Sequence, residues 1–289
     1  MLSFDYLRPQ TCSELADMLA QSGGRLIAGG TDVLPGLRRG QLAADCLIDI
    51  SGLRELRYIR EEDGEIQIGA LATHADLIAS PLLQRLAPGL IQAVATVGCP
   101  QTRYRGTLGG NLANASPAAD SAPPLLTLEC RVHLSKAAGM RSILLRDFFA
   151  GPGKTCLAAG EYIHHLSFPR PPARTGSAFT KLGKRSGMAI SVASAAAFLE
   201  LAPDGRLQTA RLAFGSVAPC PTRGAHGEEF LLGKVPGPEL FRQAGQLSLA
   251  DVAPIGDVRA SAAYRRHVIP ILAERTLAAA WKQARERLQ

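Results

Sequence analysis

Aromatic residues, paired cysteines and long apolar runs are all scarce in this chain of 289 residues. No run approaches the roughly 20 consecutive apolar residues that a membrane-spanning helix needs, so we predict no membrane span. The first residues also lack the charged-then-apolar layout of a secretory signal. We therefore expect a cytoplasmic protein.

The six cysteines never form a C-x-x-C pair. They stand at scattered positions, namely Cys12, Cys46, Cys99, Cys130, Cys156 and Cys220. This scatter is typical of a compartment that keeps thiols reduced, and it indicates neither a zinc site nor an iron–sulfur cluster in this chain.

The chain is basic, with a net charge of +7 from 32 Lys plus Arg against 25 Asp plus Glu. Aromatic residues make up only 5% of it, and no base-stacking motif is present, so nucleic acid is not the expected partner. A phosphate-bearing cofactor or an acidic partner surface accounts for the positive charge better.

Local signals place the secondary structure. Thr11 and Glu14 have the spacing of a capping box, and Gly23-Gly24 should end the helix that follows. An Asp-Gly pair at residues 204–205 between apolar runs predicts a hairpin. Strands are expected at residues 25–28, 46–50, 65–70, 125–134, 141–145, 196–201 and 207–214. Helices are expected from residue 73, at 82–97, at 238–248 and at 260–288. In the last of these helices, Pro270 should break the apolar stripe.

Closely spaced prolines at 169, 171 and 172 indicate a domain boundary, because proline interrupts both helix and sheet. We predict two domains, residues 1–172 and 173–289. Short helices mixed with scattered strands favour an α+β fold over a regular, doubly wound parallel sheet.

The segment Ala28 to Val33 follows a predicted strand and contains Gly29-Gly30. Adjacent glycines allow positive φ and let backbone N–H groups approach an anion, and the Thr31 hydroxyl can donate to the same anion. A plain strand-to-loop turn is the alternative interpretation, because Gly-Gly alone is a weak signal.

A second and richer loop runs from Thr107 to Asp120 and again pairs two glycines, Gly109-Gly110, with short polar side chains. Two such loops can hold a pyrophosphate from both sides, and Asp120 suits a ribose or ribityl hydroxyl. A capped turn in which Asn111 and Asp120 bond their own backbone is the competing interpretation. The density of small polar residues favours a binding function.

Common catalytic motifs are missing. Gly151 to Thr155 resembles the end of a phosphate-binding loop, but Phe148 stands where that motif needs glycine. Neither Gly-x-Ser-x-Gly nor His-Glu-x-x-His occurs. His164 and His165 are adjacent in a predicted strand, so their side chains should point to opposite faces and not converge.

In this order and spacing, the two loops resemble those of the FAD-binding subunits of the xanthine dehydrogenase family of molybdenum hydroxylases. The sequence motifs of this family are A-G-G-T-D near the start and Q-x-R-x-x-G-T-x-G-G-N-x-x-x-x-S-P-x-x-D in the middle. Here the first motif is Ala28 to Asp32, and the second runs from Gln101 through Gly106 to Asp120. Further similarity lies at residues 149–154, 177–181, 212–219 and 260–266, so it covers nearly the whole chain.

The resemblance implies a two-part FAD-binding domain of the vanillyl-alcohol-oxidase (PCMH) type, followed by a smaller α+β domain with an antiparallel sheet and helices. It also implies roles for individual residues. The pyrophosphate would contact Ala28, Gly29, Gly30, Thr31, Asp32, Val33, Thr107, Gly109, Gly110 and Asn111. The ribityl chain would contact Asn114 and Asp120, while Ile163 and Lys181 would approach the flavin ring.

The resemblance further implies partners. A large subunit would carry molybdopterin and the substrate site, and a small subunit would carry two [2Fe–2S] clusters. Electrons would reach FAD in this chain and leave to NAD or another acceptor, so no catalytic acid or base is expected here. The substrate stays open among xanthine, other purines, nicotinate, aldehydes and carbon monoxide.

Two alternatives remain at this point. A self-contained flavin oxidase or reductase of the same fold would need its own substrate pocket and base, and the C-terminal half offers no obvious acid–base pair. A subunit that has lost flavin would not need two intact Gly-Gly loops.

Overall fold

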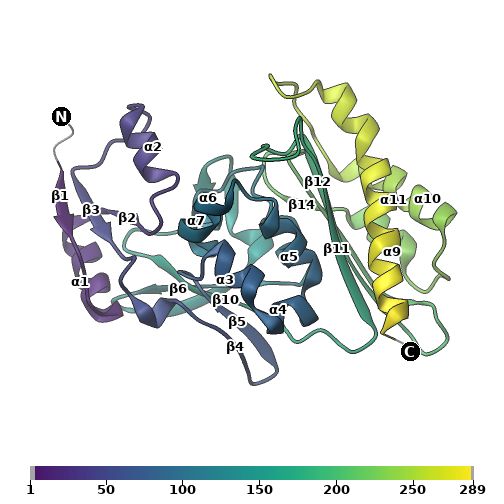
Figure 1. Ribbon diagram of the computed structural model, residues 1–289, viewed down its shortest axis with the longest axis horizontal. Helices are drawn as coiled ribbons and strands as arrows, with labels where there is room; N and C mark the ends of the chain where they lie inside the picture. Colours follow the sequence, from purple (N-terminus) through teal and green to yellow (C-terminus); the bar gives the residue numbers. More distant parts are fainter. Residues whose placement is uncertain (1–3, 288–289) are drawn as a thin grey trace.

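The structure, a computed structural model, describes residues 4–287. Three sheets of three or more strands follow one another along the molecule, as Figure 1 shows. The three-stranded sheet lies at the N-terminal end, the five-stranded sheet in the middle, and the four-stranded sheet beside the long C-terminal helix. The predicted α+β class is therefore confirmed.

The N-terminal sheet is parallel and is joined by short helices. Its strands, in spatial order, are β1 (Asp5–Leu7), β3 (Cys46–Asp49) and β2 (Arg25–Ile27), and its helices are α1 (Cys12–Ser22) and α2 (Val33–Arg38). The predicted cap is confirmed, because Thr11 Oγ1 accepts a hydrogen bond from Glu14 N at 3.2 Å and Gly23 ends α1 with φ +58°.

The middle sheet is antiparallel. Its strands, in spatial order, are β4 (Ile59–Glu62), β5 (Glu65–Gly69), β10 (Tyr162–Pro169), β6 (Arg131–Lys136) and β7 (Gly139–Leu144). One face packs into the largest core, with Ile68, Val132 and Leu166 fully buried. The helices of this region are α3 (His74–Ala79), α4 (Pro81–Leu86), α5 (Pro88–Ala95), α6 (Pro100–Arg105), α7 (Leu108–Ala113) and α8 (Ala122–Thr127).

The strand predicted at residues 125–134 was wrong in its first half. Residues 122–127 form α8, which begins with Pro123 and Pro124 in its first turn, where proline suits a helix. Glu129 then turns the chain with φ +53°, and the strand β6 starts only at Arg131. Buried leucines occur in both elements, so the apolar pattern alone did not separate them.

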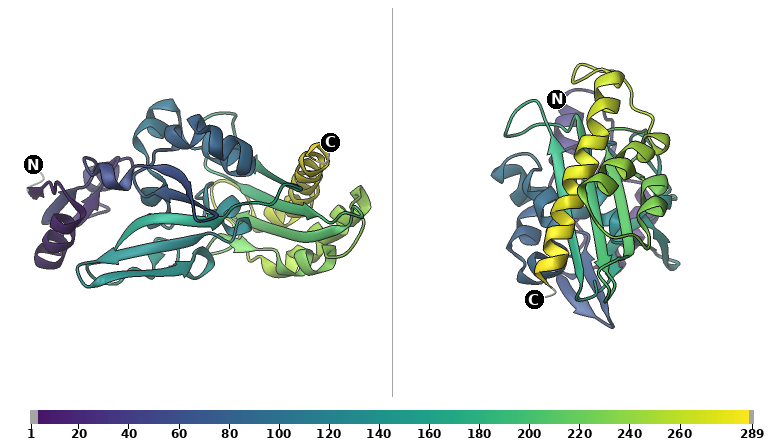
Figure 2. Two further views of the ribbon diagram at one scale, coloured as in Figure 1. Left: turned by 90° about the horizontal axis from the view of Figure 1, so that it is seen from below. Right: turned by 90° about the vertical axis from the view of Figure 1, so that its right-hand side faces the viewer.

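The C-terminal sheet is an antiparallel meander, and the right-hand view of Figure 2 shows one long helix lying across its face. Its elements are β11 (Thr175–Leu182), β12 (Ala193–Leu201), β13 (Leu207–Gly215), β14 (Thr222–Arg223), α9 (Ala225–Leu231), α10 (Pro238–Leu247) and α11 (Ala262–Glu286). The predicted Asp-Gly hairpin joins β12 and β13, with Gly205 at φ +82°. Pro270 does not break the stripe of α11, because it is itself buried beside Ile269. The expected last residue of this helix, Leu288, lies outside the described residues.

Minor elements complete the chain. They are a small hairpin, β8 (Phe149–Gly151) and β9 (Lys154–Thr155), and three 3-10 turns, η1 (Arg54–Leu56), η2 (Leu145–Asp147) and η3 (Ser248–Asp251). Across residues 4–287, no helix combines the length and apolarity needed to cross a membrane.

The middle and C-terminal sheets belong to one packed unit. Phe198 of β12 and Ala213 of β13 are buried in the core of the middle sheet. Helix α5 lies against β11, and Gln92 Oε1 accepts a hydrogen bond from Phe179 N at 2.8 Å. Side chains from before and after residue 172 therefore pack against one another in fixed positions.

Candidate functional site

The first Gly-Gly loop leaves β2 and enters α2 with its backbone donors free. Gly30 has φ +72°, and a side chain on Gly29 would collide with the backbone carbonyl of Arg105. Among residues 4–287, no group accepts a hydrogen bond from the backbone N–H groups of residues 29–32. Consecutive free N–H groups in such a turn form a concavity that binds anions.

The second loop is built differently. Thr107 caps α7 by accepting from Gly110 N at 3.1 Å, and the N–H groups of Leu108 and Gly109 donate to carbonyls of residues 72 and 70. A Cβ on Gly109 would lie 2.8 Å from both Cβ and O of Ala70. Gly109 therefore allows close packing at the end of β5, and the N–H groups of both Gly109 and Gly110 are already used by the fold.

Side chains, not N–H groups, are what the second loop offers to a ligand. Asn111 Oδ1 accepts from Ser121 Oγ at 2.6 Å, which orients the Asn111 amide. Asn114 Nδ2 donates to Asp32 Oδ1 at 3.4 Å and so joins the two loops. The structure thus brings the two predicted loops together.

His74 lies beside Gly106, where the two loops meet. The sequence did not single it out as a site residue. The side chain is buried, with 2% of its surface exposed, and its backbone N–H donates to Gly106 O at 3.0 Å. Its Nδ1 has no hydrogen-bond partner among the described residues. Burial, with a smaller effect from Arg103, lowers the pKa of His74 to about 4, so the imidazole is neutral at neutral pH. The only sequence signal was its place in the helix start after Thr73.

Asp120 and Lys181 were each expected beside the cofactor, and they contact one another. Lys181 Nζ donates to Asp120 Oδ2 at 2.6 Å and to Thr96 O at 3.2 Å, with both charged side chains almost fully buried. Ser191 Oγ donates to Asp120 Oδ1 at 2.5 Å. Desolvation raises the pKa of Asp120 in spite of these bonds. The pair ties the second loop to strand β11.

Ile163 lies in β10 and is buried in the core of the middle sheet, with 6% of its surface exposed. The expectation for the next two residues was wrong. A bulge in β10 displaces His164, and its Nδ1 lies 2.9 Å from Nδ1 of His165. A bulge adds one residue to a strand and thereby breaks the alternation of faces on which that expectation depended.

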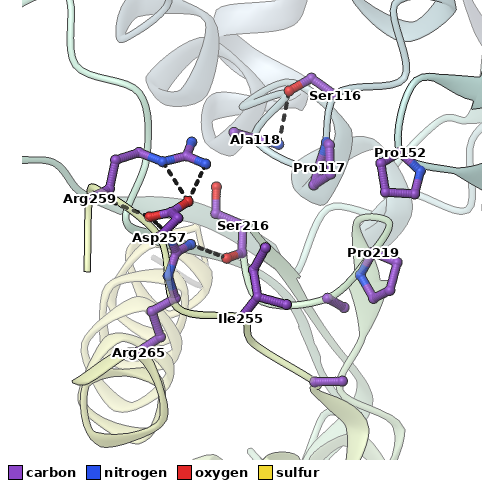
Figure 3. A pocket seen from close by; sticks show the side chains of 12 residues that line it. Ser116, Pro117, Ala118, Pro152, Ser216, Pro219, Ile255, Asp257, Arg259 and Arg265 are labelled. Atoms are coloured by element: carbon purple, nitrogen blue, oxygen red, sulfur yellow. Dashed lines mark hydrogen bonds and ion pairs between the residues drawn. The ribbon is translucent and has the colours of Figure 1, made fainter. Parts of the chain in front are cut away.

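A cavity of about 230 Å³ lies between the second loop, the β8–β9 turn and the segments 216–219 and 253–265. Figure 3 shows it. Its walls include the rings of Pro117, Pro152 and Pro219, and its polar end includes Ser216 and Arg265. Residues 149–154, 212–219 and 260–266 are three of the segments that carry the family resemblance in the sequence. The structure shows that all three segments meet at this cavity.

The sheets define an α+β protein. The loop with free N–H groups and the buried Asp120–Lys181 ion pair are features that suit a phosphate-bearing cofactor. Sequence comparison identifies the cofactor. The family described as the FAD binding domain in molybdopterin dehydrogenase matches residues 2–171, and the CO dehydrogenase flavoprotein C-terminal domain matches residues 178–280.

Relatives of known type cover the whole chain. A xanthine dehydrogenase FAD-binding subunit of Escherichia coli is 34% identical over 98% of both chains. The carbon monoxide dehydrogenase medium chain of Hydrogenophaga pseudoflava is 32% identical over 96% of this chain and 97% of its own length. A solved structure of carbon monoxide dehydrogenase from the same organism, lacking the Mo-pyranopterin moiety of its cofactor, gives a TM-score of 0.93 at 32% identity and covers 97% of this chain and 98% of its own.

The chain belongs to the family of FAD-binding medium subunits of the xanthine dehydrogenase and carbon monoxide dehydrogenase type. It is thus an oxidoreductase subunit with an FAD-binding domain. The residues present fit this cofactor, because the free N–H groups at 29–32 suit a pyrophosphate and the Gly29–Arg105 contact excludes any larger residue there.

Proposed function

We propose that this chain carries the FAD of a multi-subunit molybdenum hydroxylase and transfers electrons from the [2Fe–2S] clusters of a small partner subunit to NAD or another acceptor. A large partner subunit with molybdopterin would hold the substrate site. Bound FAD supplies the redox chemistry, and this chain binds it, orients it and excludes water. The proposal depends on the backbone N–H groups of residues 29–32, for which residues 4–287 provide no hydrogen-bond acceptor.

The pyrophosphate would lie against Ala28 to Val33, since that segment combines the N–H groups of residues 29–32 with the Thr31 hydroxyl. The side chains of Thr107, Asn111 and Asn114 would bound the same site, with Gly109 giving the close approach to the end of β5 and Gly110 lying beside Thr107. Asp120 and Lys181 would meet the ribityl chain and the ring as a pair, and Ile163 would support the ring from the core.

We assign the acceptor to the cavity of Figure 3. The cavity adjoins the segment Ser116–Ala118, which leads directly to Asp120. Its polar end carries two guanidinium groups, Arg259 and Arg265, against the single carboxylate of Asp257. An apolar wall with a donor-rich end suits a planar acceptor that presents a carbonyl oxygen, as nicotinamide does.

The division of the chain into residues 1–172 and 173–289 is also a proposal, supported by the prolines at 169, 171 and 172. The competing function is a self-contained flavin oxidase. A self-contained oxidase would need a free base at the cavity. The Asp257 carboxylate does not meet this need, because it is already bound by Arg259 and Arg265.

The test is to purify the chain with its native partners and to record flavin absorption together with molybdenum and iron content. Flavin, both metals and two further polypeptides would support the proposal. Flavin on an isolated, metal-free chain that oxidises substrate alone would favour the competing function. In the same preparation, Asn111→Leu should lose flavin, because it removes an amide that Ser121 holds in place. A variant that keeps full flavin content would refute the site assignment.

A further inference from the structure

Arg265 is the largest fully buried side chain among residues 4–287, with 2% of its surface exposed. From the first turn of α11, its Nη1 donates to Val192 O at 2.8 Å and to Ser216 O at 2.5 Å. Its Nη2 donates to Asp257 Oδ1 at 2.7 Å. Val192 precedes β12 and Ser216 follows β13, so one guanidinium joins the ends of two paired strands.

On one side, the bonds of Arg265 lead to the proposed flavin site. Val192 is next to Ser191, whose Oγ donates to Asp120 Oδ1 at 2.5 Å. Asp120 in turn binds Lys181. Ser191 is fully buried and Asp120 nearly so, and hydrogen bonds in such a water-poor region are strong and sensitive to small displacements. The position of Arg265 therefore helps to set the Asp120–Lys181 pair.

On the other side, the same side chain borders the cavity. Arg265 Nε and Ser216 Oγ are buried and have no hydrogen-bond partner among the described residues. In Figure 3 the Ser216 hydroxyl points into the space between Arg259 and Pro117. Ser216 also has φ +63°, a conformation that residues other than glycine rarely adopt, and the bond from Arg265 to its carbonyl helps to hold it.

We propose that Arg265 is a positioning residue that couples the acceptor cavity to the Asp120–Lys181 pair. A ligand that accepts from Nε or from the Ser216 hydroxyl shifts the guanidinium, and the shift reaches Asp120 through Val192 and Ser191. The coupling is reciprocal, so the state of the flavin site also alters acceptor affinity. This proposal depends on the function proposed above.

A lysine cannot reproduce this arrangement. The planar guanidinium presents several N–H groups at fixed angles and can serve two carbonyls and a carboxylate together. An ammonium in the place of Arg265 keeps the charge near Asp257, but it cannot hold Val192 and Ser216 in the same relation. Arg265→Lys thus separates the positioning role from the charge.

The experiment uses the intact complex with NAD⁺ and NADH as probes. It compares Arg265→Lys, Ser191→Ala and Ser216→Ala by flavin midpoint potential and by KM and kcat for NAD⁺. Ser191→Ala should shift the flavin potential and also change KM, because it removes the bond through which the reciprocal coupling runs. Ser216→Ala should raise KM and leave the potential unchanged. Arg265→Lys should change both, with KM rising about 10-fold, in the range of typical coupling between sites.

Arg223→Lys is the matched control. Arg223 is a mostly buried arginine that bridges Glu129 and Glu228 away from the cavity, and its replacement should lower the midpoint of thermal unfolding without moving potential or KM. The proposal is overturned if Arg265→Lys behaves like Arg223→Lys. The two alanine variants keep the test valid if Arg265→Lys does not fold, and the proposal then fails if Ser191→Ala shifts the flavin potential without changing KM.

The outcomes also separate this proposal from the one on which it depends. A wild-type complex that holds no FAD, or that reduces no acceptor, contradicts the proposed function. A wild-type complex that holds FAD and reduces NAD⁺, with Arg265→Lys unchanged in both measurements, contradicts the coupling alone.

Discussion

The buried histidine behind the two loops should make the stability of this protein fall in mild acid. His74 is neutral in the fold, because burial and the nearby Arg103 lower its pKa from 6.5 to about 4. In the unfolded chain the same imidazole takes up a proton near pH 6.5. Between these two values the unfolded state binds more protons, so acidification favours unfolding.

The magnitude follows from the two pKa values. Each pKa unit corresponds to about 1.4 kcal/mol of differential protonation. From about pH 7.5 to about pH 5, the His74 contribution to the free energy of unfolding should fall by about 2 kcal/mol, and by roughly 3 kcal/mol at pH 4. Above about pH 7.5 the imidazole is almost entirely neutral in both states, and the contribution is nearly constant.

The assay is urea unfolding at several pH values for the wild type and His74→Gln, which has no titrating group. The variant starts from a different stability at neutral pH, but its loss on acidification should be smaller than that of the wild type by about 2 kcal/mol at about pH 5. His226→Gln removes a largely exposed histidine on α9 and controls for the loss of a histidine as such. Parallel curves for the wild type and His74→Gln would refute the reasoning.

Two further predictions concern the site. Gly29→Ala should lower the FAD content and reduce the free energy of unfolding by about 1–3 kcal/mol, because its Cβ would collide with the carbonyl of Arg105. Gly237→Ala is the control, because a Cβ there meets nothing within 4 Å, and it should retain full flavin. Equal flavin content in both variants would contradict the role of the Gly29 contact. Lys181→Met should destabilise the chain by about 3 kcal/mol, because it leaves Asp120 buried without its cation, whereas Lys181→Arg should lose less. Thermal unfolding measures this, and an unchanged midpoint for Lys181→Met would contradict it.

Features that depend on a few adjacent residues could be predicted from the sequence. The helix capped by Thr11, the Asp-Gly hairpin at 204–205 and the turn at Gly29-Gly30 each follow from the backbone preferences of the residues concerned. The two Gly-Gly motifs also carried the family resemblance, which sequence comparison bears out. Local chemistry and motif spacing were enough for the class of protein and for its cofactor.

Tertiary packing decided the rest. Residues 125–127 are helical because two prolines start a helix there, and apolar periodicity could not distinguish that from a strand. His164 and His165 meet because a bulge breaks the alternation of β10. Asp120 and Lys181 are 61 residues apart in sequence, and only the packing of β11 beside the second loop makes them partners.

The cavity of Figure 3 and Arg265 belong to the same class of features. The three segments that meet at the cavity are far apart in the chain, and the sequence spacing contains nothing about their approach. A buried guanidinium is stable only where several carbonyl and carboxylate oxygens converge on it, and that convergence exists only in the folded protein. The sequence thus determined which cofactor the chain binds, and the tertiary structure determined how the second loop, the cavity and the Arg265 side chain come together.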